Sequence, residues 1–116
     1  MAHSSSDELW LKAARYSIQQ SNYLTANVDF DNVNAHIFNT LQYFIISDEI
    51  RQAELQLRTS AYDYFTLVRS RWMKGPSDPQ VMAAKAAAIE ALDHLDDLLK
   101  TAPSSDLAKA LGIGLS

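Results

Sequence analysis

The amino-acid sequence predicts an all-α protein, a compact antiparallel helical bundle of about four main helices plus a short C-terminal helix. Three observations lead to this expectation. Apolar residues recur at intervals of three and four along most of the chain, which is the period of helices with one buried face. The chain has only 3 glycines and 3 prolines, so turns are few and the elements between them are long. Several segments also open on the serine or aspartate residues that cap helices.

The first helix is expected from about Ser6 to Asn22, because Ser5-Ser6-Asp7-Glu8 has the composition of a capping box. The segment from Leu24 to Asp31 is interpreted as a connection, since Asn27, Asp29 and Asp31 are all candidate caps. The second helix would then begin at Asp31. The expected core stripe of the first helix is Trp10, Leu11, Ala14 and Ile18, and that of the second is Val33, Ile37, Leu41, Phe44 and Ile45.

A change of phase near Ser47 predicts a break after the second helix. The apolar stripe beyond this point would lie on the opposite side of a straight helix continued from Asp31. Ser47-Asp48-Glu49 stands at the change and has the features of an N-cap. The alternative is one uninterrupted helix to Gly75, which would be unusually long. The stripe of the third helix is Ile50, Ala53, Leu57, Ala61, Tyr64, Val68 and Trp72, with Phe65 at its edge.

Glycine and proline punctuate the rest of the chain. Gly75-Pro76 is expected to end the third helix, and Asp78-Pro79 provides the cap and first position of the fourth. The fourth helix should run to about Lys100 and be broken by Ala102-Pro103-Ser104. Ser105 would cap a last helix from Asp106 to Leu111. The inward-facing residues of the fourth helix are expected to be Val81, Ala88, Leu92, Leu95 and Leu99.

Composition limits the classes of function. We expect one domain over residues 1–116, with flexible tails at 1–5 and 112–116. The absence of cysteine excludes disulfides, thiolate metal sites and cysteine nucleophiles, and no apolar run is long enough to span a membrane. A net charge of −4 argues against nucleic acid as a partner. Without a secretory signal pattern, cytoplasm is the default location. No nucleotide-binding or serine-nucleophile motif is present, so a non-catalytic protein without a cofactor is expected.

Two helices carry a second apolar stripe opposite the expected core stripe. A surface helix of a monomer needs only one apolar face, so a second one indicates either a binding partner or a helix packed between two others. Tyrosine, methionine and arginine are enriched at protein interfaces, which favours the partner. The candidate partner-binding residues are Leu9, Tyr16 and Tyr23 on the first helix, and Leu55, Tyr62 and Met73 on the third, flanked by Arg51, Arg58 and Arg69.

The hypothesis that follows is a non-catalytic helical interaction or assembly module, either a homo-oligomer or an adaptor for another protein. Small components of phages or of secretion systems, and inhibitors of larger proteins, have this profile. In a first alternative, Arg51, Arg58 and Arg69 belong to a nucleic-acid-associated regulator. As a structural matter, the same arginines either form a solvated charged face, which is favoured, or pair with the acidic row Glu90, Asp93 and Asp97 of the fourth helix. In a second, Glu90, His94 and Asp97 hold a metal in a helical enzyme, because they project from one helix face.

Overall fold

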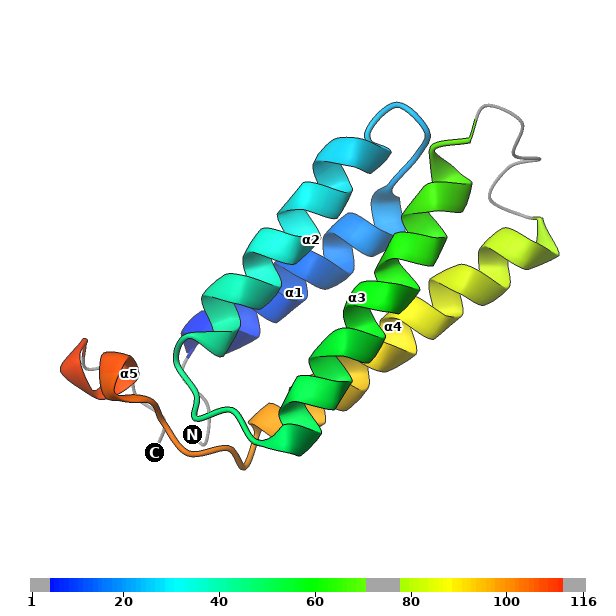
Figure 1. Ribbon diagram of the computed structural model, residues 1–116. Coiled ribbons are helices and arrows are strands. Elements are labelled where there is room, and N and C mark those ends of the chain that lie inside the picture. Colours follow the sequence, from blue (N-terminus) through cyan, green and yellow to red (C-terminus); the bar gives the residue numbers. More distant parts are fainter. Residues whose placement is uncertain (1–4, 71–77, 112–116) are drawn as a thin grey trace.

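The computed structural model describes residues 5–70 and 78–111, and in the first helix it describes side chains from Leu11 onward. Four helices run alternately up and down, and a short fifth lies beyond one end of the bundle (Figure 1). The predicted all-α bundle is therefore confirmed. The helices are α1 (Ser5–Gln20), α2 (Ala26–Leu41), α3 (Asp48–Val68), α4 (Pro79–Leu99) and α5 (Asp106–Ala110).

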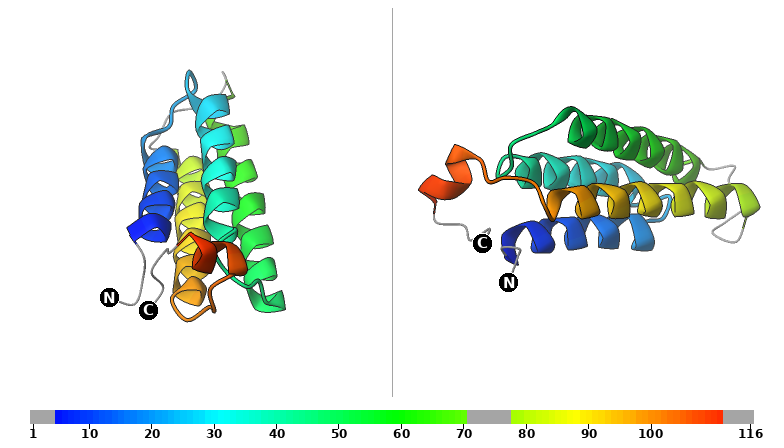
Figure 2. Two further views of the ribbon diagram at one scale, coloured as in Figure 1. Left: turned by 90° about the vertical axis from the view of Figure 1, so that its left-hand side faces the viewer. Right: turned by 90° about the horizontal axis from the view of Figure 1, so that it is seen from below.

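The bundle consists of two helical hairpins that pack against each other. α1 contacts mainly α2, and α3 contacts mainly α4 (Figure 2). One hydrophobic core lies between the hairpins, and all five residues predicted to face inward from α4 are buried. Burial of such side chains away from water is the main force that holds the helices together. The largest fully buried side chains include Ile18, Ile37, Leu57, Phe65, Leu92, Leu95 and Leu99.

The predicted break between the second and third helices is confirmed. α2 ends at Leu41 and α3 begins at Asp48. The side-chain oxygen of Ser47 accepts a hydrogen bond of 3.2 Å from the backbone N–H of Ile50, which satisfies one of the unpaired amides of the first turn. The acidic Asp48 and Glu49 lie in that turn, where the helix dipole favours negative charge.

A C-terminal segment clamps the connection between α2 and α3. The N–H of Ile45 donates to the carbonyl of Pro103 at 2.9 Å, and the N–H of Ser105 donates to the carbonyl of Tyr43 at 3.0 Å. Phe44 and Ser104 form an isolated antiparallel bridge between these bonds. Successive side chains of extended backbone point to opposite sides, so Phe44 is buried while Ile45 is 55% exposed. The expectation that Ile45 belongs to the core stripe of α2 is wrong for this reason.

The second helix begins at Ala26, five residues before the predicted start at Asp31. Asn22 forms the turn instead, because its side-chain oxygen accepts hydrogen bonds from the N–H groups of Leu24 and Thr25. Asp29, which the sequence offers as a cap, faces inward and accepts a 3.1 Å hydrogen bond from the side chain of Gln20. Its position in the first turn of α2 places the carboxylate near the positive end of the helix dipole.

The third helix ends at Val68, earlier than the predicted end at Gly75-Pro76. The N–H of Ser70 bonds to the carbonyl of Leu67, which tightens the last turn and satisfies a terminal carbonyl. Trp72, Gly75 and Pro76 lie outside the described residues. The caps of the last two helices are confirmed, since the side chains of Asp78 and Ser105 accept hydrogen bonds from the first turns of α4 and α5.

Replacement of Leu92 by alanine is expected to lower the free energy of unfolding by about 2–5 kcal/mol, because Leu92 is fully buried and its removal leaves a cavity. Chemical denaturation measures this loss. Leu24→Ala is the matched control, since Leu24 is 77% exposed and its truncation should change stability by less than about 0.5 kcal/mol. Equal losses in the two variants would contradict the placement of α4 in the core.

Candidate functional site

The predicted second stripes lie on the surface of the protein. Tyr16 is 66% exposed, Tyr23 56%, Leu55 66% and Tyr62 52%. These four residues are therefore not packed between helices. Internal burial does not explain the described part of either stripe. Tyr23 lies in the turn after α1 rather than on the helix itself. Leu9 belongs to α1, but its side chain is outside the described part, and so is all of Met73.

Leu55 and Tyr62 belong to a continuous exposed strip of α3, which we call the outer edge. Its members follow one another at alternating intervals of three and four residues, so they form one line along the helix. None of them carries a charge. The outer edge consists of Gln52, Leu55, Thr59, Tyr62 and Thr66, all of which are exposed.

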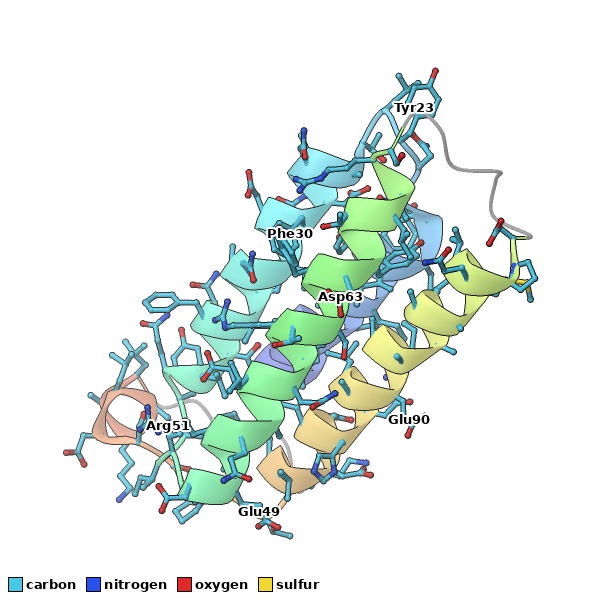
Figure 3. The ribbon with its side chains drawn as sticks, turned by 45° about the vertical axis from the view of Figure 1, so that its right-hand side comes forward. Tyr23, Phe30, Glu49, Arg51, Asp63 and Glu90 are labelled. Atoms are coloured by element: carbon cyan, nitrogen blue, oxygen red, sulfur yellow. The ribbon has the colours of Figure 1, made fainter. Side chains whose placement is uncertain are left out.

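The predicted arginines line the flank of α3 that faces α2. Arg58 donates one hydrogen bond of 2.8 Å to the side chain of Glu54 and another of 2.8 Å to the side chain of Asn34 on α2. Arg51 points toward the same side in Figure 3, which looks onto α3 with α2 and α4 on either side. Together with Gln52, Glu54 and Leu55, Arg51 and Arg58 line a shallow hollow of about 330 Å³.

Aromatic contacts hold the C-terminal part of this arginine flank, the side of α3 that carries Arg51, Arg58 and Arg69. The ring of Tyr62 meets Phe30 of α2 edge-on at a centroid distance of 6.1 Å, and the guanidinium of Arg69 lies 6.0 Å from the Tyr62 ring centre. Arg69 also donates a 3.4 Å hydrogen bond to the side chain of Asn27. Arg58 and Arg69 are therefore held by contacts within the protein, and side chains already held in this way lower the entropic cost of forming an interface.

The arginine row does not pair with the acidic row of α4, Glu90, Asp93 and Asp97, which excludes the pairing that the sequence left open as an alternative. The arginines face α2, on the other side of α3 from α4. Asp93 pairs instead with Arg15 of α1, and Asp97 pairs with Lys100 at 3.2 Å. The flank of α3 toward α4 carries exposed acidic residues of its own, Glu49 and Asp63, and neither forms an ion pair with another described residue.

The candidate metal ligands Glu90, His94 and Asp97 do not form a metal-binding group. Among the described side chains, from residue 11 to 70 and from 78 to 111, no set of three or more His, Asp or Glu is placed to hold a metal ion. Glu90 and His94 share a hollow of about 300 Å³ with Gln56 of α3, but Asp97 does not line it. Glu90, His94 and Asp97 are therefore not placed to coordinate one metal ion, although the sequence predicts that they share a helix face.

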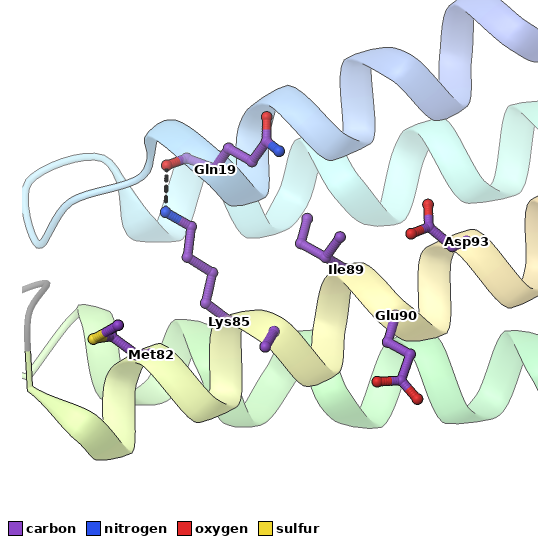
Figure 4. Close-up of a pocket in the computed structure, with 7 residues that line it drawn as sticks. Gln19, Met82, Lys85, Ile89, Glu90 and Asp93 are labelled. Atoms are coloured by element: carbon purple, nitrogen blue, oxygen red, sulfur yellow. Dashed lines mark hydrogen bonds between the residues drawn. The ribbon is translucent and has the colours of Figure 1, made fainter.

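A larger open groove of about 770 Å³ lies between α1 and α4. Lys85 reaches across it and donates a 2.9 Å hydrogen bond to the carbonyl of Gln19, in the last turn of α1 (Figure 4). Ile89 lies between the two helices, while Glu90 and Asp93 point in different directions (Figure 4). Lys85 thus supplies a hydrogen bond and a positive charge to the C-terminal end of α1. The last carbonyls of a helix lack partners within it, and the helix dipole favours positive charge there.

Sequence reasoning missed the residues of α2 that take part in the arginine flank. Asn27, Phe30 and Asn34 contact α3, and Phe38 is exposed on the same helix at about the level of Leu55. Asn34 and Phe38 lie within the predicted second helix and off its core stripe, so a helical wheel of that helix already separates them from the core. The late predicted start at Asp31 hid only Asn27 and Phe30, which precede it.

None of the helices in the described ranges is long and apolar enough to cross a membrane. Comparisons of the chain with protein-family models, with curated proteins and with solved structures found no match. Function must therefore be argued from the residues and their arrangement.

His36 on α2 is expected to make the stability of the fold depend on pH. Its Nδ1 atom is buried without a hydrogen-bond partner among the described residues, and burial lowers the pKa of this histidine below its ordinary value of 6.5. In the unfolded chain the same side chain takes up its proton near pH 6.5, so the unfolded state binds more protons in this range.

The free energy of unfolding is thus expected to fall as pH decreases through 6.5, until the lowered folded pKa is reached. His36→Gln should remove this part of the pH dependence, measured by denaturant titrations from about pH 7.5 to about pH 5. His94→Gln, which replaces an exposed histidine, is the control. An unchanged slope in His36→Gln would show that its burial does not affect stability.

Proposed function

We propose that this protein is a non-catalytic helical interaction module that binds a protein through the outer edge of α3 and the arginine flank beside it. The observation that carries the proposal is the exposure of Leu55 and Tyr62 next to arginines that are already held in place. Tyrosine and arginine are the side chains most often found at the energetic centres of protein interfaces.

The form of the surface supports binding to a protein rather than to a small substrate. The outer edge is a ridge, and the hollow next to it is open and shallow. Small-molecule sites are usually concave and cover most of their ligand. A ridge with two large apolar side chains and ordered arginines instead suits a complementary protein surface. The exposed Tyr16 of α1 is a separate surface that an assembly could also use.

Tyr62→Ala is expected to weaken association by about 1–2 kcal/mol or more, because a buried aromatic anchor is lost from the interface. The measurement is the mass of the protein in solution, alone and in an extract of its native cells. Since the Tyr62 ring also contacts Phe30, the variant should lose some stability as a monomer. Leu55→Ala separates the two effects, because Leu55 is 66% exposed.

Val28→Ala is the matched control, since Val28 is an exposed apolar residue of α2 whose position on the helix faces away from α3. The proposal requires that Tyr62→Ala and Leu55→Ala reduce the mass of the complex while Val28→Ala does not. If the wild-type protein has the mass of a monomer both alone and in the extract, the proposal is overturned.

A further inference from the structure

The outer edge of α3 has the spacing of a coiled-coil seam. Gln52, Leu55, Thr59, Tyr62 and Thr66 alternate at intervals of three and four, and in a heptad repeat Leu55 and Tyr62 then occupy the same position, seven residues apart. All five residues are exposed and uncharged. A solvent-facing helix edge is ordinarily charged or polar, whereas two large apolar residues lie on this one.

Opposite charges line the two sides of this seam. Arg51 and Arg58 stand on the α2 side, where Arg58 also forms an ion pair of 2.8 Å with Glu54, and Glu49 and Asp63 stand on the α4 side. These are the positions that flank the seam of a coiled coil, where charged pairs between helices set partner and orientation. Glu49 and Asp63 form no ion pair with any described residue of the chain.

We infer that the outer edge binds a second copy of this chain, with the two α3 helices side by side and parallel about a twofold axis. This inference rests on the proposed function and names its partner. A twofold axis along the helices places the basic flank of each copy against the acidic flank of the other. Arg58 of one copy then stands opposite Asp63 of the second, twice by symmetry.

The antiparallel arrangement lacks this complementarity. It would place basic flank against basic flank, where Arg51 and Arg58 of the two copies repel each other, and like charges across an interface are unfavourable. In either arrangement α3 is accessible to a second copy, because it forms a corner between α2 and α4 (Figures 2 and 3). The contact is confined to one helix of each copy, so the dimer is weak and reversible.

The absence of cysteine from the chain allows a direct test by single-cysteine variants of the 116-residue chain. Gln52→Cys and Thr66→Cys lie near opposite ends of the outer edge, and parallel pairing places each beside its own copy in the second chain. Each variant alone should therefore form a disulfide-linked dimer under mild oxidation. Asn32→Cys, exposed on α2 away from the edge, should not.

An antiparallel pair would give the opposite pattern, with a disulfide only when Gln52→Cys and Thr66→Cys are mixed. That result would overturn the inference. Cross-linking of all three variants at similar rates would show random collision and would also overturn the inference. The absence of cross-linking in all three would overturn it as well.

A charge exchange tests the flanks independently. Arg58→Glu and Asp63→Arg should each raise the dissociation constant of the dimer by about tenfold, because each turns two attractive pairs into two repulsive ones. The double variant should recover much of this loss, since the two exchanged side chains again carry opposite charges and attract across the interface. Sedimentation over a range of concentrations and salt gives the constants. Circular dichroism at low concentration establishes that the monomers remain folded, which matters because Arg58 also bonds to Glu54 and Asn34.

A partner other than a second copy would leave the proposed function intact, and one outcome distinguishes this case. If the protein is a monomer alone but joins a larger complex in its native extract, and Tyr62→Ala abolishes that complex, the partner is another protein. The proposed function then stands and the second copy is excluded. A double charge variant no better than either single variant would likewise overturn the parallel pairing.

Discussion

The reversal of the chain between Leu41 and Asp48 is the constraint on which the rest of the structure depends. A straight helix through this region would turn one apolar stripe toward the core and the next toward solvent. The Ser47 cap and the bonds from Ile45 and Ser105 end one helix and start another, so both stripes reach the same core. The hydrophobic effect alone could not achieve this, because it acts on area and does not specify direction.

The same reversal creates the polar surface of the protein. α3 runs back along α2, which places Asn34 within reach of Arg58 and Asn27 within reach of Arg69. α4 then covers the other side of α3. The two sides of α3 therefore have different neighbours. Arg58 lies on the α2 side, where it pairs with Glu54 and Asn34, while Glu49 and Asp63 lie on the α4 side. This placement of charge follows from the antiparallel topology.

The extent to which the sequence predicts the fold depends on whether a signal is local. Asp78-Pro79 and the alanine-rich stretch after it specify α4 by capping and helix propensity, so its bounds follow from the sequence. The three candidate caps Asn27, Asp29 and Asp31 are misleading, because all of them lie inside α2 and Asn22 forms the turn before it. Asp29 is buried and bonds to Gln20 of another helix, a contact that no local pattern reveals. The exposed stripe on α3 is visible as periodicity, whereas the asparagines that order its arginines are visible only once the helices are placed.

The bond from Ser105 to the carbonyl of Gln42 joins positions 63 residues apart, whereas each hairpin pairs helices that are neighbours in sequence. Contacts between residues close in sequence form quickly. Closing a long loop costs conformational entropy, and this cost is offset only after other contacts have formed. The two hairpins are therefore expected to fold before the clamp closes over the α2–α3 connection. On this reasoning, the connection between the hairpins is the last part of the molecule to become fixed.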